Sequence, residues 1–134
     1  MHRNQVLIEE VLRLHGTHDI DALLSHFADN VVYEDVALAR KSTDRAGTRE
    51  LFQELFQQIP DFHSELVSVL VTETSGAVEY VQRGTHLGEG FGYPATGKPI
   101  VIRTAAIIRF DQGLVTHWSD YWSWSDFLKQ AGLA

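Results

Sequence analysis

Apolar residues recur at helical spacing in the first fifth of the chain. Residues 4–15 place them on one stripe, which predicts an amphipathic helix ending at Gly16. Asp19 is a suitable N-cap for a second, shorter helix. Both segments would contribute to one core, through Leu7, Ile8, Val11, Leu12, Leu14, Leu23, Leu24 and Phe27.

The pattern then changes to the period of two that is typical of strands. A turn at Asp29 and Asn30 leads into a predicted strand over 31–36, and residues 37–44 read as a loop. A third helix follows, because Leu51, Phe52, Leu55, Phe56 and Ile59 lie at helical spacing before Pro60. Gly47 leaves the start of this helix undefined.

The second half of the chain has the character of a β-sheet. Strands are predicted over 64–72, 77–87, 100–110 and 114–122. Hairpin turns are expected at 75–76 and 111–113, whereas 88–99 is a longer connection rich in glycine and proline. A short last helix over 126–131 would be capped by Ser125 and ended by Gly132.

Three helices before a run of antiparallel strands predict an α+β fold, with the helices packed on one face of a curved sheet. The length of 134 residues fits a single domain over 1–134. No internal repeat or low-complexity tract interrupts it.

The charge and composition narrow the classes of partner. The net charge is −7 with scattered acidic residues, which argues against nucleic-acid binding; the cluster Arg40, Lys41 and Arg45 reads as a solvated loop. No apolar run approaches the length of a membrane helix. Because the N-terminus carries Glu9 and Glu10 and the chain has no cysteine, we expect no export signal and a cytoplasmic location.

Several familiar motifs are absent or incomplete. Residues 92–99 approach a phosphate-binding loop, but Pro99 replaces the required Ser or Thr and a strand follows instead of a helix. The seven histidines show no zinc spacing, and no serine elbow or cysteine nucleophile is present. We therefore expect no metal and no cofactor.

The most informative segment is 116–124. Alternation places Trp118, Asp120 and Trp122 on one face. If that face is inward, burial would raise the pKa of the Asp120 carboxyl and suit it to proton transfer near neutral pH. The alternative is that Asp120 faces solvent and the tryptophans only fill the core.

A second candidate pair, Tyr33 and Asp35, shares one face of the first strand. If it lines the same cavity, the site would hold two carboxylates and a phenol, an arrangement that supports proton abstraction and return. Otherwise Asp35 only ends the strand at an exposed turn. His86 and His117 lie on strands and are reserve hydrogen-bond donors or pocket-lining residues rather than metal ligands.

Spaced motifs over nearly the whole chain resemble the SnoaL-like polyketide cyclase family of the nuclear transport factor 2-like superfamily. They comprise residues 27–30, 59–62, 84–98 and 111–113, and Trp118-x-Asp120. The resemblance implies a cone-shaped α+β barrel, with Asp120 matching the aspartate that acts as general acid or base. The segment from Trp118 to Tyr121 also resembles the corresponding segment of limonene epoxide hydrolases. The Arg-x-Asp pair that those hydrolases carry on an earlier strand is replaced here by Tyr80-x-Gln82. Residues 32–36 resemble the segment of ketosteroid isomerases that holds their base, which would be Asp35.

The leading hypothesis is a cofactor-independent cyclase or isomerase acting on a small hydrophobic, carbonyl-containing or polycyclic molecule. Asp120 would move the proton, Asp35, Tyr33 and His86 would assist, and Trp118, Trp122, Phe56 and His117 would line the pocket. Water activation on an epoxide and a non-catalytic binding module are the alternatives. Val81, Leu87, Val101 and Ile107 predict an apolar outer sheet face and a homodimer.

Overall fold

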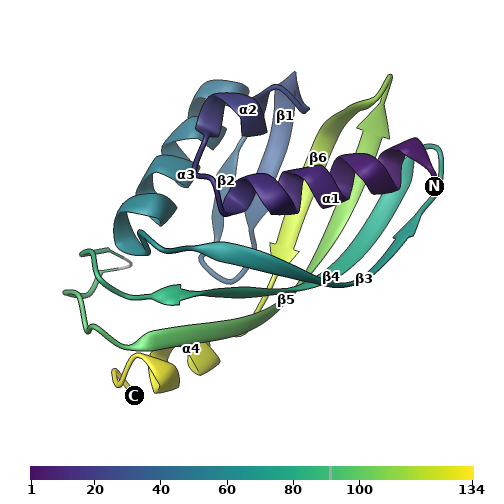
Figure 1. Cartoon of the computed structure of the whole chain (residues 1–134). Helices are drawn as coiled ribbons and strands as arrows, with labels where there is room; N and C mark the ends of the chain where they lie inside the picture. The colour runs from purple at the N-terminus through teal and green to yellow at the C-terminus, as the bar shows by residue number, and fades with distance from the viewer. Residues whose placement is uncertain (91) are drawn as a thin grey trace.

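Six strands form one mixed sheet with four helices around it, in a computed structural model that describes residues 1–90 and 92–134 (Figure 1). In chain order the elements are α1 (Arg3–His15), α2 (Ile20–Leu24), β1 (Phe27–Asp35), β2 (Arg40–Ser42), α3 (Arg45–Gln58), β3 (His63–Val71), β4 (Ser75–Thr85), β5 (Pro99–Asp111), β6 (Leu114–Tyr121) and α4 (Trp124–Gln130).

The strand order is β2-β1-β6-β5-β4-β3, and β1 runs parallel to β6 while every other neighbouring pair is antiparallel. The predicted α+β class is confirmed. The sheet curves strongly around α1 but does not close, because β2 and β3 end the order at opposite edges (Figure 1). The fourth helix, α4, packs against β5 at the far end of the curve.

Several local predictions are wrong. Asp29 and Asn30 form no turn but continue β1, which accommodates them through a shift of register with β6 between Phe27 and Val32. The segment 37–44 contains β2, which is too short to show an alternating pattern. Ser123 rather than Ser125 caps α4, because the Ser123 hydroxyl accepts from the Asp126 N–H.

The turns follow simple backbone chemistry. Gln112 and Gly113 both have positive φ, as a two-residue hairpin requires, and they join β5 to β6 as predicted. The preceding hairpin turns at 72–74 rather than at 75–76, since Ser75 already belongs to β4. The connection 88–99 contains residue 91, which lies outside the described residues.

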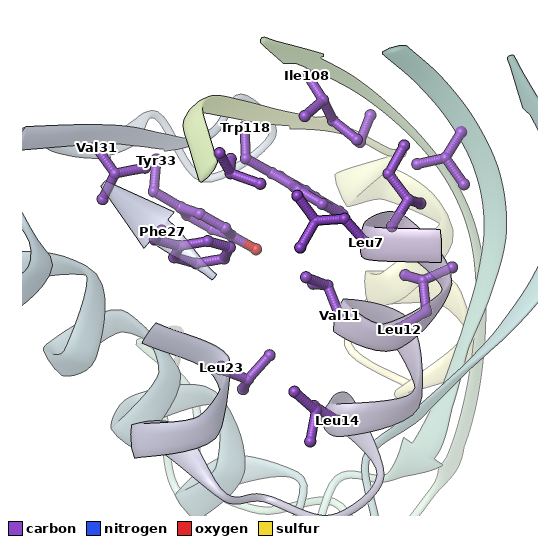
Figure 2. Packing of buried hydrophobic residues seen from close by; sticks show 14 of the residues in the cluster. Leu7, Val11, Leu12, Leu14, Leu23, Phe27, Val31, Tyr33, Ile108 and Trp118 are labelled. Atoms are coloured by element: carbon purple, nitrogen blue, oxygen red, sulfur yellow. The ribbon is translucent and has the colours of Figure 1, made fainter. Parts of the chain in front are cut away.

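One apolar core joins the helices to the concave face of the sheet. Side chains of α1, among them Leu7 and Val11, point toward Phe27 and Tyr33 of β1 and Trp118 of β6 (Figure 2). A smaller cluster joins Ile100 and Ile102 of β5 to Phe127 and Ala131 at the C-terminal end. In the described part of the chain, none of the helices has the length and apolarity to cross a membrane.

Candidate active site

A cavity lies inside the curve of the sheet, with α1 and α3 on one side and the start of α4 on the other. It offers about 80 Å³ to the centres of water-sized molecules, which is room for several waters or one small organic molecule. Its wall is mainly apolar and comes from α3, the segment after it, β5 and the C-terminal region: Leu51, Phe52, Leu55, Ile59, Phe62, Ile100, Ile102, Trp122 and Phe127.

Asp120 lies in this wall near the end of β6 and is only 4% exposed. Three side chains donate hydrogen bonds to its carboxylate. Tyr80 Oη and Trp118 Nε1 donate to Oδ1 over 2.6 and 2.8 Å, and Tyr33 Oη donates to Oδ2 over 3.0 Å. The carboxylate is therefore held in one orientation by groups from three strands.

Burial raises the pKa of Asp120 to about 6. The bonds from Tyr80, Trp118 and Tyr33 favour the ionised carboxylate and oppose this rise, whereas the nearby charge of Asp35 adds to it. The group thus changes protonation close to neutral pH, as a residue that both takes and returns a proton needs to do.

Asp35 reaches the same cavity because β1 and β6 run in parallel register. The register pairs Asp35 with Asp120 and Tyr33 with Trp118, so both carboxylates leave the sheet on the same face. Asp35 Oδ1 accepts from Trp122 Nε1 and from the Leu38 backbone N–H, each over 3.0 Å. Burial raises the pKa of Asp35, and these two hydrogen bonds act in the opposite direction.

These contacts predict two opposite shifts in the titration of Asp120. Tyr80→Phe removes a hydrogen bond to the ionised form and should raise the pKa of Asp120, whereas Asp35→Asn removes a neighbouring negative charge and should lower it. Carbon-13 NMR of the Asp120 carboxyl would measure both. Tyr121→Phe is the matched control, because Tyr121 is exposed on the other face of β6. Shifts of the same sign in both variants would contradict this electrostatic account.

The predicted aromatic residues divide into three places. Trp122 lines the cavity and orients Asp35. Trp118 is fully buried in the core, outside the cavity wall, where it donates to Asp120 and stacks on Tyr33. Phe56 also lies outside the wall, because its ring stacks on His18 with centroids 4.0 Å apart. The expectation that Trp118 and Phe56 would line the pocket therefore needs correction.

Neither predicted histidine lies in the cavity wall. His117 is exposed on the opposite face of β6, as alternation from Trp118 requires, so its assignment to the pocket is wrong. His86 is buried just after β4, where Nδ1 lies 3.1 Å from Thr96 Oγ1 and its ring meets Phe127 edge-on. His86 therefore organises the connection 88–99 beside the cavity.

Sequence reasoning missed several polar residues of the site, among them Tyr80 and His15. Tyr80 shares the inner face of β4 with Val78, and alternation could have identified it as a partner of Asp120. His15 lines the cavity from the last turn of α1; it follows Val11 by four positions and therefore extends the apolar stripe inward. Throughout residues 1–90 and 92–134, no group of three or more histidine or acidic side chains is arranged to hold a metal ion.

Comparison with known proteins places this geometry in a family. The model of the SnoaL-like domain matches residues 8–118, which is most of the chain. The chain belongs to the SnoaL-like domain family. Among curated proteins, a relative is the cyclase AurE of Calcarisporium arbuscula, 27% identical over 109 residues that cover 81% of this chain and 77% of that protein.

Solved structures show the same fold as this SnoaL-like chain. IdmH of Streptomyces antibioticus, a putative polyketide cyclase, superposes with a TM-score of 0.84 at 22% identity, covering 98% of this chain and 99% of that one. A protein of Catenulispora acidiphila with a ketosteroid isomerase-like fold, solved with trimethylamine, gives 0.82 at 22% identity, covering 96% and 93%.

Proposed function

We propose that this SnoaL-like protein catalyses proton transfer at a carbon next to a carbonyl in a small, largely apolar substrate, leading to aldol-type cyclisation or isomerisation. The observation that carries the proposal is the buried Asp120, whose pKa of about 6 and fixed orientation suit a general acid and base. The cyclase AurE and IdmH, a putative polyketide cyclase, support the same reaction class.

The hydrogen bonds of Asp120 identify the oxygen that would react. A carboxylate offers about two acceptor positions on each oxygen. Both positions on Oδ1 are occupied by Tyr80 and Trp118, whereas Oδ2 accepts only from Tyr33 among the described residues. The remaining lone pair of Oδ2 is therefore the position for a substrate proton.

In the proposed cyclisation, ionised Asp120 takes a proton from the carbon beside one carbonyl. The resulting enolate forms a carbon–carbon bond with a second carbonyl carbon, and that oxygen becomes an alkoxide. Protonated Asp120 then returns its proton to the alkoxide, which regenerates the carboxylate and leaves a β-hydroxy ketone. Ionised Asp35 beside Asp120 would help to keep the pKa of the reacting carboxyl raised.

The apolar wall defines the class of substrate. Phe52, Phe62 and Ile102 offer no hydrogen bonds from their side chains, so they favour hydrocarbon or aromatic surface. They also limit water near the two carboxylates, which strengthens electrostatic interactions within the site. A compact aryl ketone matches this wall better than a sugar or a nucleotide.

A linear aryl diketone whose carbonyls are separated by three methylenes tests the proposal. Base-catalysed closure converts it to a phenylcyclohexenone with loss of one water, which is followed by its ultraviolet absorbance. We expect wild-type protein to accelerate closure in proportion to its concentration. A rate equal to that with an equal mass of serum albumin would contradict the proposal.

Epoxide hydrolysis is the second candidate, because a buried aspartate can also activate water. The position of the hydrolases' Arg-x-Asp pair is here occupied by Tyr80 and Gln82, and Gln82 lines the cavity without a charge. Incubation with styrene oxide in heavy-oxygen water distinguishes the two reactions, since only hydrolysis incorporates solvent oxygen. A non-catalytic binding module would bind the aryl diketone and leave it unchanged.

We also propose that two copies associate through the outer face of the sheet. This face exposes apolar side chains on three adjacent strands, including Leu70, 76% exposed, and Ile107, 50% exposed. Of the four residues named from the sequence, Val81, Val101 and Ile107 lie on this face and Leu87 follows the end of β4.

Light scattering at micromolar concentration should give twice the monomer mass of 15.1 kDa. Ile107→Arg should shift the mass toward the monomer, because it places a charge within the apolar face. Val6→Arg is the matched control, since Val6 is similarly exposed but lies on α1. A monomer mass for the wild type would contradict the association.

A further inference from the structure

His15 places a polar group inside the cavity that the proposed proton transfer does not use. The residue ends α1, is 1% exposed, and lines the cavity together with Phe52 and Phe62, whose rings contact it. Its Nε2 is buried and has no hydrogen-bond partner among the described residues. A buried polar atom without a partner is destabilising, so its retention at a cavity indicates a ligand that supplies one.

The other ring nitrogen of His15 is already engaged. Nδ1 lies 2.8 Å from Ser64 Oγ on β3, and Ser64 can donate its hydroxyl proton to that nitrogen. When Ser64 donates this proton, Nε2 is the protonated nitrogen of a ring that lines the cavity. Burial lowers the pKa of His15 to about 3, so the ring is neutral and acts as a hydrogen-bond donor without adding charge beside the carboxylates.

The position of His15 separates it from the reacting carboxylate. No contact joins the two residues directly among those described, and Tyr80 contacts both: its ring centroid is 6.2 Å from that of His15, and its Oη donates to Asp120. A molecule whose reacting carbon lies at Asp120 would therefore present a different part of its structure to His15. Gln58 supplies a similar signal, because its buried Oε1 also lines the cavity without a hydrogen-bond partner in the described chain.

We infer that His15 Nε2–H binds a carbonyl oxygen of the ligand at the α1 end of the cavity, remote from Asp120, and so selects oxygenated aryl compounds over hydrocarbons of the same shape. The inference builds on the proposed function, because it assigns the residue that holds the substrate's second oxygen. It concerns binding, and its test needs no turnover.

Acetophenone and α-methylstyrene are a suitable probe pair, since they have the same shape and differ in an oxygen replaced by a methylene. Their dissociation constants are measured by NMR titration at about pH 8, where Asp120 is ionised and donates no proton. The ratio of the two dissociation constants is then compared between variants. Because the two probes differ in hydrophobicity by the same amount in every variant, that difference cancels in the comparison.

We expect His15→Phe to lower the preference for acetophenone by about three- to tenfold relative to wild type, the range expected for one neutral hydrogen bond. His117→Phe is the matched control, because His117 is exposed on the outer face. In wild-type protein, the nitrogen-15 signal of His15 Nε2 should show a bonded proton and should shift with acetophenone but not with α-methylstyrene.

An unchanged ratio in His15→Phe would overturn the inference, as would a proton on Nδ1 instead of Nε2. A protein that binds the probes in this way but closes no diketone would refute the proposed function alone, so the two ideas fail separately.

Discussion

Replacement of Asp120 with asparagine should reduce the rate of diketone closure by about 10²- to 10⁴-fold, the usual contribution of a positioned acid or base. Asparagine has nearly the same shape and keeps an acceptor oxygen for Tyr80 and Trp118, but it takes no proton at the position of Oδ2. The loss should lie mainly in kcat, because Asp120 is assigned to proton transfer rather than to the binding of the apolar part of the substrate.

The matched control is Asp111→Asn, which removes the same charge from an exposed position at the end of β5. It should leave the rate unchanged. Circular dichroism and a cooperative melting transition would verify that both variants fold. A folded Asp120→Asn protein that retains wild-type kcat would remove this carboxylate from the reaction and leave the cavity as a binding site.

The site residues that could be predicted from the sequence are those that strand alternation places on one face. Tyr33, Asp35 and Asp120 were proposed from a period of two, and the structure brings all three to one cavity because β1 and β6 lie side by side in parallel. That pairing joins segments almost ninety positions apart in the sequence, and alternation within each strand contains no information about it. The resemblance to a known family assigned a specific role to Asp120 and Asp35. The catalytic roles of these residues stay predictions.

The parts that could not be predicted share a physical cause. Trp118 and Trp122 have the same parity in sequence, yet one fills the core and the other lines the cavity, because β6 ends at Tyr121 and the chain then turns toward α4. Phe56 looked like a pocket residue but stacks on His18, whose place after α1 depends on packing between helices. Burial of a face can be read from spacing, whereas the location of an empty volume depends on how separate elements meet.

The same reasoning explains why the sequence suggested His117 and not His15 as a pocket residue. A histidine on a strand beside Trp118 suggested the pocket, although its parity placed it on the opposite face. A histidine on the apolar stripe of a helix resembles an ordinary core residue until a cavity is found beside its ring. A role for an isolated polar residue such as His15 can therefore be inferred only after the neighbouring cavity has been located.

Asp120 should also lower the stability of the wild-type protein as the pH rises. Its folded pKa of about 6 lies above its ordinary value of 3.8. Below about pH 4 the carboxyl is protonated in both states and imposes no penalty. As the pH rises toward 6, ionisation increasingly favours the unfolded chain; above about pH 6 the full penalty is present, on the order of 3 kcal/mol.

Urea unfolding from about pH 4 to about pH 8 would test this penalty, with Asp120→Asn as the comparison. The two proteins should have similar free energies of unfolding at the acidic end, and the variant should become the more stable by up to about 3 kcal/mol at the alkaline end. Groups that do not interact with Asp120 titrate alike in both proteins and cancel in the difference, and Asp111→Asn should follow the wild type. Parallel curves would show that Asp120 titrates alike in folded and unfolded chains, whereas a widening gap would show that the fold holds this acid at a cost in stability.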